Sequence, residues 1–334
     1  MTEAHPTRPP LTAEEIDGAK AALDRLSATF EATVVGQPQL LRALLVTVLS
    51  QGHILLESVP GLAKTLAAST LARAVDGSFA RVQCTPDLLP SDIIGSQIFD
   101  QATRGFTTEL GPVHANFVLL DEINRSSAKT QSAMLEAMQE RQTTIGGHTY
   151  RLPDPFVVLA TQNPIEEEGT YVLPQAQLDR FLLKEVVAYP SPDDEFEVLT
   201  RSEEGTFEHT TAACATTAEV RRLQELTKRV RVDDAIKRYI VELVNVSRRP
   251  ADFLSGDQAR WIEYGASPRG ALAFLHAARA SALLDGRGYV VPGDVTGLRH
   301  AVLRHRLILT FEALAERVRP EELVDAIFAA VPTP

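Results

Sequence analysis

Cysteine is scarce in this chain of 334 residues. The two cysteines, Cys84 and Cys214, lie far apart and fit no metal-binding spacing such as C-x-x-C. A disulfide-stapled fold is therefore excluded, and reduced, buried thiols suited to the cytosol are expected.

Long apolar runs are also missing. The best candidate, Leu40–Leu49, carries Arg42 and is about half of the ~20 residues that a membrane span needs. The first ten residues contain three prolines and no apolar core of a signal peptide. We therefore expect no membrane span and a cytoplasmic location.

An excess of basic residues is the third absence. The chain has 44 acidic and 33 basic residues, a formal charge of −11, and residues 1–190 alone contribute −8. Proteins that bind nucleic acid non-specifically rely on basic side chains, so no nucleic-acid partner is expected. Any nucleotide bound by the acidic first part needs a locally positive site.

Apolar segments alternate with helical patterns in the first part of the chain. Five short runs read as buried parallel strands: His53–Glu57, Phe79–Cys84, Phe117–Asp121, Val157–Thr161 and Leu182–Val187. Helical patterns separate most of them: Lys64–Val75, Lys129–Glu140 and Leu173–Phe181. This order predicts an α/β fold with a parallel sheet covered on both faces.

Two segments interrupt that alternation. Residues 94–114 and 142–152 read as β-hairpins, the second with Gly146-Gly147 as a two-residue turn. Beyond Tyr189 the strand signals fade and helical patterns follow to the end. We therefore predict two domains: residues 1–192, an N-terminal helix and α/β core with both hairpins, and residues 193–334, an all-α domain.

The first strand leads into a candidate phosphate loop, Ser58-Val59-Pro60-Gly61-Leu62-Ala63-Lys64-Thr65, and then a helix that continues with Leu66. Loop N–H groups and a helix N-terminus bind phosphates, while a lysine adds charge and a threonine hydroxyl can bind Mg²⁺. Ser58 and Ala63 stand where the G-x-x-x-x-G-K-[ST] pattern has glycine. An ordinary strand–helix turn with an exposed lysine is the alternative for this octapeptide alone.

Polar residues end two of the other strands. Asp121 and Glu122 close the third strand, where one carboxylate can hold a metal and the other can polarise a water. Asn163 follows the fourth strand and could orient that water or hold a phosphate. Ligands of open α/β sheets bind beyond the carboxyl ends of the strands, so these residues are expected to meet the phosphate loop.

Several motifs in order resemble the MoxR family of AAA+ ATPases. They are DLLPSDIIG (87–95), DEINR (121–125), KTQSAMLEAMQE (129–140), LATQNP (159–164), EGTYVLPQAQLDRF (168–181) and GASPRG (265–270). The resemblance runs from about Gly36 to the end of the chain. It implies a P-loop αβα sandwich with a five-stranded parallel sheet, a C-terminal helical lid, and ATP with Mg²⁺ between subunits of a homo-oligomeric, usually hexameric, ring.

The resemblance also implies roles for single residues. Lys64 and Thr65 would be Walker A residues, Asp121 and Glu122 Walker B, Asn163 sensor 1 and Arg269 sensor 2. Arg180 would be the arginine finger, for which Arg125 is a second candidate, and the two hairpins would face the centre of the ring. The segment near the adenine would be Val35, Gly36 and Gln37, and the phosphate loop would contribute Pro60, Gly61, Leu62, Ala63, Lys64, Thr65 and Leu66.

Local sequence supports one of these roles independently. Ser267, Pro268 and Arg269 read as N-cap, N1 and N2 of a helix. An arginine at the positive end of a helix is unfavourable unless an anion binds there. This favours a phosphate role for Arg269 over a solvated surface arginine.

The functional hypothesis is an ATPase that exerts force on a protein client. The resemblance suggests a chaperone for complex assembly or metal cofactor insertion, often acting on partners with a von Willebrand factor A domain. Two alternatives stay open: a nucleic-acid motor of the same superfamily, and a non-catalytic ATP-dependent scaffold. The second is motivated by Ser58 and Ala63, which we expect to reduce hydrolysis rather than abolish it.

Overall fold

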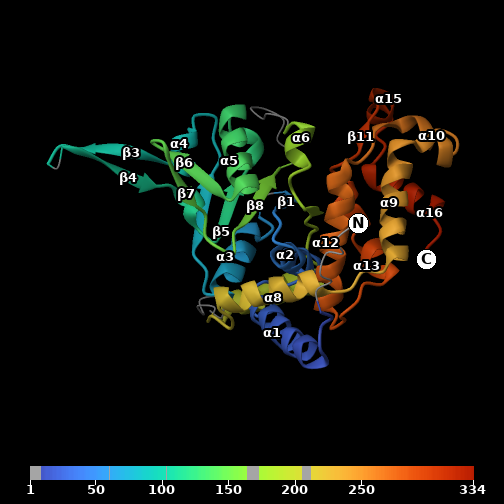
Figure 1. Cartoon of the computed structure of the whole chain (residues 1–334), viewed down its shortest axis with the longest axis horizontal. Helices are drawn as coiled ribbons and strands as arrows, with labels where there is room; N and C mark the ends of the chain where they lie inside the picture. Colours follow the sequence, from blue (N-terminus) through green and yellow to red (C-terminus); the bar gives the residue numbers. More distant parts are fainter. Residues whose placement is uncertain (1–8, 60, 103, 164–172, 205–211) are drawn as a thin grey trace, which may run out of the picture. The chain divides into compact units, whose positions relative to one another are not determined.

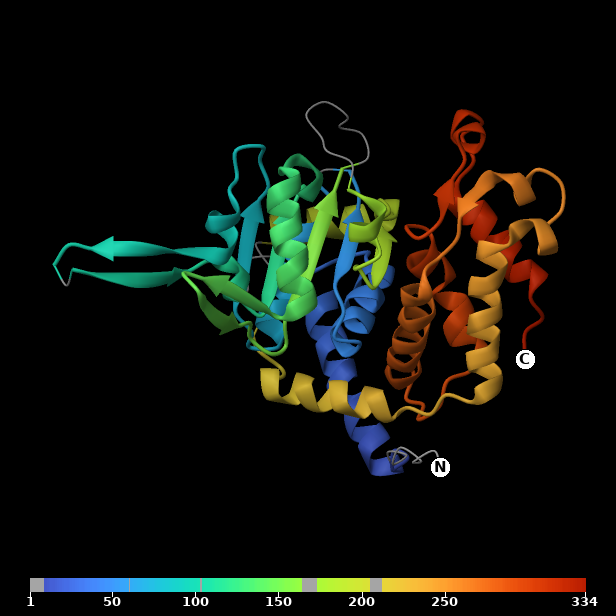
Figure 2. The ribbon, with the colours of Figure 1, turned by 45° about the horizontal axis from the view of Figure 1, so that its top comes forward.

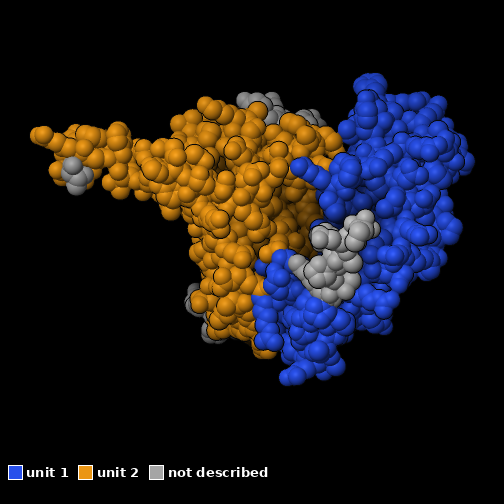
Figure 3. Space-filling view, viewed as in Figure 1, with its two compact units in different colours: residues 1–24, 222–334 blue, residues 25–221 orange. Residues whose placement is uncertain are grey.

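The computed structural model describes residues 9–59, 61–102, 104–163, 173–204 and 212–334. The chain forms two compact units, one of residues 25–221 and one of residues 1–24 with 222–334 (Figure 3). Residues 193–221 thus group with the sheet, so the units do not divide at residue 192. The assignment of 1–192 and 193–334 as functional domains stays a prediction.

The unit of residues 25–221 is built on a five-stranded sheet of order β2-β5-β8-β1-β9. Its strands, all parallel, are β1 (Ile54–Glu57), β2 (Phe79–Gln83), β5 (Phe117–Asp121), β8 (Val157–Gln162) and β9 (Leu183–Val186). Each of the five predicted strands is confirmed to within a residue at either end. β8 is the central strand, between β5 and β1, so the carboxyl ends of these three parallel strands lie side by side.

Helices cover both faces of this sheet (Figure 1). α5 (Ala128–Glu140) shares one buried cluster with Leu55, Val118 and Val158, which point to the same face. The alternating residues, such as Leu119, are equally buried, which requires cover on the other face. The remaining helices of the unit are α2 (Pro38–Leu49), α3 (Lys64–Ala74), α4 (Pro90–Ile94), α6 (Gln175–Leu178) and α7 (Pro192–Glu203), with 3₁₀ turns η1 (Pro112–His114) and η2 (Ile123–Arg125).

Both predicted hairpins are confirmed. β3 (Gly95–Asp100) pairs with β4 (Gly105–Leu110), and β6 (Gln142–Ile145) pairs with β7 (His148–Arg151). Gly146 and Gly147 have φ of 57° and 83°, the left-handed backbone that a two-residue turn requires. Figures 1 and 2 show β3–β4 reaching away from the sheet.

One predicted helix is wrong in length. In place of Leu173–Phe181 the structure has only α6, Gln175–Leu178. A residue before proline is pushed toward extended backbone, so Leu173 cannot begin a helix that runs through Pro174. At the other end the chain turns directly into β9, with the Leu182 N–H donating to the His53 carbonyl at 2.8 Å.

The second unit is mainly helical. α1 (Ala13–Glu31) and α8 (Thr217–Arg229) each begin in one unit and end in the other. The other helices are α9 (Asp234–Arg248), α10 (Pro250–Phe253), α11 (Gln258–Trp261), α12 (Pro268–Leu284), α13 (Pro292–Gly297), α14 (Arg299–Leu303), α15 (Phe311–Ala315) and α16 (Pro320–Ala330). Their core includes Phe274, which packs against Phe328 with ring centroids 6.0 Å apart.

Two features of this unit differ from the sequence prediction. A short antiparallel pair, β10 (Ile262–Tyr264) with β11 (Ile308–Leu309), interrupts the all-α pattern. The helical pattern of residues 292–303, a single helix by sequence, forms two helices, α13 and α14, that meet at Leu298. Within the described residues no helix is both long and apolar enough to cross a membrane.

Candidate active site

The candidate phosphate loop joins β1 to α3. Gly61 has φ +87°, and no atom lies within 4 Å of where a Cβ would stand. Ala63 is the N-cap of α3 with φ 50°, so a non-glycine residue adopts left-handed backbone here. Pro60 lies outside the described residues. The loop thus opens beside a helix N-terminus, as a phosphate-binding loop requires.

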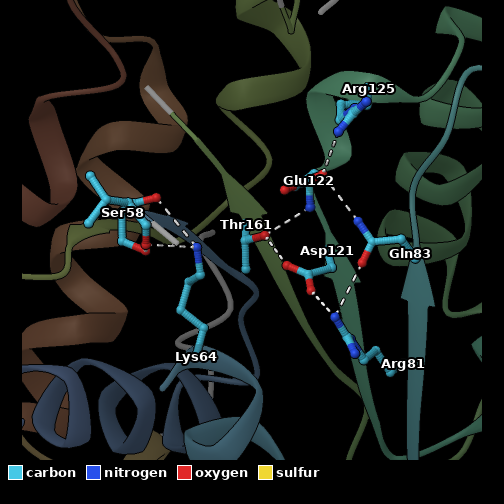
Figure 4. Close-up of polar contacts among 9 residues, drawn as sticks. Ser58, Lys64, Arg81, Gln83, Asp121, Glu122, Arg125 and Thr161 are labelled. Carbon is cyan, nitrogen blue, oxygen red and sulfur yellow. Dashed lines mark hydrogen bonds and ion pairs between the residues drawn. The ribbon is translucent and has the colours of Figure 1, made fainter. Parts of the chain in front are cut away.

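Lys64 begins α3, and its half-buried ammonium lies over the loop. Its Nζ donates to the carbonyl oxygens of Ser58 at 3.4 Å and Val59 at 3.5 Å. Burial lowers the pKa of Lys64, whereas the charges of Asp121 and Glu122 act in the opposite direction. Figure 4 shows the ammonium and both carboxylates at the same edge of the sheet. The structure therefore brings the predicted Walker A lysine and Walker B acids together.

Asp121 is fixed from two sides. Its Oδ1 accepts from Thr161 Oγ1 at 2.7 Å, and its Oδ2 forms an ion pair with an Arg81 nitrogen at 2.6 Å. The Thr161 hydroxyl also accepts from the Glu122 N–H at 2.8 Å. One hydroxyl on β8 therefore aligns both acids at the end of β5 (Figure 4).

Glu122 has a φ of 56°, a left-handed backbone conformation that is strained for residues other than glycine. Its Oε2 accepts from Gln83 Nε2 at 3.1 Å and pairs with an Arg125 nitrogen at 3.3 Å. The side chain is 21% exposed. A carboxylate held at this turn, beside the loop, is suitably placed to orient a water molecule.

Asn163 follows β8 and is buried, 6% exposed. Since β8 lies between β5 and β1, Asn163 leaves the sheet between the two acids and the phosphate loop. This is the position predicted for it.

The three candidate arginines differ in their surroundings. Arg125 is engaged with Glu122 of its own chain. Arg180 follows α6 and is half-buried. Arg269 is exposed at the second position of α12, in the other compact unit, where its N–H donates to the Ser267 hydroxyl at 3.0 Å. The predicted N-cap at Ser267 is confirmed.

The segment assigned to the adenine lies before α2. Gly36 has φ +70°, and a Cβ there would stand 2.7 Å from the Asp194 Cβ. Gln37 is the N-cap of α2, and its Nε2 donates to the Ala188 carbonyl at 3.1 Å. Among the other predicted contacts, Val35 and Thr65 are half-buried, Leu62 is buried, and Leu66 is exposed.

Three residues of the site are absent from the functional residues predicted from the sequence: Arg81, Gln83 and Thr161. Arg81 and Gln83 alternate along β2, and their polarity within an otherwise apolar strand was an available signal. Thr161 carried no such signal, because its role depends on how β8 pairs beside β5.

The residues present fit a magnesium ion that arrives with a nucleotide. Within the described ranges, no cluster of three or more His, Cys, Asp or Glu side chains could hold a metal ion. Mg²⁺ typically binds through one or two carboxylates and the phosphates of a substrate. Asp121 and Thr65, the second residue of α3, offer such a partial donor set, and the open space beside Gly61 leaves room for phosphate.

Comparisons with known proteins find similarity over both parts of the chain. Residues 53–183 match the family described as "ATPase family associated with various cellular activities (AAA)", and residues 257–327 match "AAA lid domain". Chaperone MoxR1 of Mycobacterium tuberculosis is 48% identical over 98% of this chain and 86% of its own length. Protein MoxR of Paracoccus denitrificans is 36% identical over 92% of this chain and 95% of its own length.

A solved structure is also similar. A crystal structure of a protein assigned as an ATPase from Cytophaga hutchinsonii superposes with a TM-score of 0.91 and 42% identity. The match covers 96% of this chain and 97% of that one.

Proposed function

The chain belongs to the MoxR family of AAA+ ATPases, and from this premise we propose that it hydrolyses Mg·ATP in a homo-oligomeric ring to remodel a protein client. The observation that carries the proposal is the pair Asp121–Glu122, aligned by the Thr161 hydroxyl at the edge where Lys64 lies. The functional domains are the core of 1–192 and the lid of 193–334, and the location is cytoplasmic, in keeping with two free cysteines.

The catalytic step is assigned to residues of the site. Asp121 and Thr65 would hold Mg²⁺, which supplies charge neutralisation for the phosphates. Glu122 orients the attacking water and accepts its proton, and Asn163 holds that water or the γ-phosphate. Lys64 binds the β- and γ-phosphates, and the developing charge is stabilised further by Arg269 from the lid.

A neighbouring subunit completes the site in this proposal. Arg180 is the finger, because Arg125 pairs with Glu122 of its own chain. A ring, usually a hexamer in this family, supplies such a neighbour to every site.

Client contact is assigned to the hairpins. The β3–β4 hairpin exposes Ile98, Phe99, Phe106 and Leu110, and the rings of Phe99 and Phe106 pack edge to face with centroids 5.4 Å apart. An exposed apolar surface of this kind is typical of protein contact. The client class is a protein in complex assembly or metal cofactor insertion, with a von Willebrand factor A domain as the first type to test.

Trapping tests the proposal as a whole. Glu122→Gln, which retains the shape of the side chain but not its charge, should accumulate with ATP as an oligomer and retain its client. Replacing Phe99 and Phe106 by Ser in that background should remove the client and leave oligomer and ATP in place. Recovery of a monomer without ATP would contradict the proposal.

A further inference from the structure

The edge strand β2 places two polar side chains beside the Walker B acids. Arg81 and Gln83 are two residues apart and so point to the same face of the sheet. In the parallel pairing with β5, Gln83 stands opposite Asp121. Neither residue has a part in the ATPase mechanism above.

These two side chains connect the acids in a single polar chain (Figure 4). An Arg81 nitrogen lies 2.6 Å from Asp121 Oδ2 and 3.2 Å from Gln83 Oε1. Gln83 Nε2 donates to Glu122 Oε2 at 3.1 Å. Because the guanidinium only donates, it holds the amide oxygen of Gln83 and thereby turns the amide nitrogen toward Glu122.

Arg81 and a metal ion would require the same carboxylate. Thr161 engages Oδ1 of Asp121 and Arg81 engages Oδ2. A divalent cation on Asp121 would repel the guanidinium and weaken its hold on Oδ2. Half of the Arg81 side chain is exposed, 49%, so it can leave for solvent.

We propose that Arg81 is a positioning residue that holds Asp121 when no metal is bound and competes with the metal of Mg·nucleotide for its Oδ2. This inference rests on the proposed function, since it requires a metal at Asp121.

Direct metal binding tests the competition without reference to turnover. Mn²⁺ would be titrated into the full-length protein saturated with ADP, and free Mn²⁺ would be measured by electron paramagnetic resonance. Exposed ion pairs contribute little, so Arg81→Gln should bind Mn²⁺ about two- to fivefold more tightly than the unaltered protein. Arg81→Lys, which retains the charge, should stay closer to the unaltered protein.

Arg73→Gln is the matched control. Arg73 is exposed in the last turn of α3, and its replacement removes the same charge from the same compact unit. It should leave Mn²⁺ affinity unchanged. Equal or weaker Mn²⁺ binding by Arg81→Gln, or an equal gain in Arg73→Gln, would overturn the proposal.

Asp121→Asn distinguishes failure of this inference from failure of the proposed function. If this substitution does not change Mn²⁺ binding, the metal site of the proposed function is contradicted as well. If it weakens Mn²⁺ binding but Arg81→Gln binds Mn²⁺ like the unaltered protein, only this inference is contradicted.

Discussion

A buried histidine at the start of β1 gives a sharp prediction about stability and pH. His53 is 6% exposed, and its Nδ1 accepts from the Val158 N–H at 3.0 Å. Its Nε2 lies 3.2 Å from the Met138 carbonyl, to which it donates in the neutral tautomer. Burial foremost, and then the charge of Arg141, lower the pKa of His53 to about 3.

The sign of the pH effect follows from this pKa. An unfolded histidine has a pKa of about 6.5, so acid protonates the unfolded chain before the folded one. The contribution of His53 to stability is complete above about pH 6.5 and is lost as the pH falls toward 3. The free energy of unfolding changes by about 1.4 kcal/mol per pH unit for one proton, so it falls by about 2 kcal/mol between about pH 7.5 and pH 5.

Urea unfolding followed by far-ultraviolet circular dichroism at both pH values measures this loss. Because other groups also titrate in this range, the loss of stability is compared with that of His53→Gln, whose side chain at position 53 cannot take up a proton. The variant should be less stable at neutral pH but lose about 2 kcal/mol less on acidification. His148→Gln, which alters an exposed histidine of the same unit, should lose as much as the unaltered protein. Equal losses in all three proteins would contradict this role of His53 in the pH dependence of stability.

Three further predictions concern the nucleotide site. Gly36→Ala should lower the unfolding free energy by about 1–3 kcal/mol and weaken ATP binding, because its Cβ meets Asp194 at a positive φ; an unchanged melting temperature would contradict this. Ala63→Gly relieves left-handed backbone and should stabilise the protein by up to about 1 kcal/mol in thermal unfolding, whereas a loss of stability would count against the assigned strain. Arg180→Ala should be inactive alone but regain ATPase activity when mixed with Glu122→Gln, because one mixed interface then holds both residues; no recovery would argue against a finger supplied by the neighbour.

Much of the fold could be predicted from local sequence. Strands buried on both faces require continuous apolar runs, so Phe117–Asp121 was predicted at its observed ends. Gly146-Gly147 marked a tight turn, because few other residues accept its backbone. The acids were found because ligands gather where parallel strands end.

The remainder depends on contacts between distant segments. The pairing of β2 with β5 puts Arg81 and Gln83 beside the acids, and no local pattern encodes that register. β10 and β11 are too short to leave a periodic signal, and they pair across some forty residues of chain. The capping motif was enough to place Arg269 at the start of its helix. Such a motif does not show how the unit that carries Arg269 lies relative to a nucleotide bound by the other unit.

The central claim is that Glu122 drives ATP hydrolysis at this site. Its most direct test is single-turnover hydrolysis of ATP by the assembled protein, with and without Glu122→Gln, together with ATP affinity. In Glu122→Gln the hydrolysis rate should fall by about 10²–10⁴-fold, with ATP affinity retained. Hydrolysis at an undiminished rate in Glu122→Gln would contradict it.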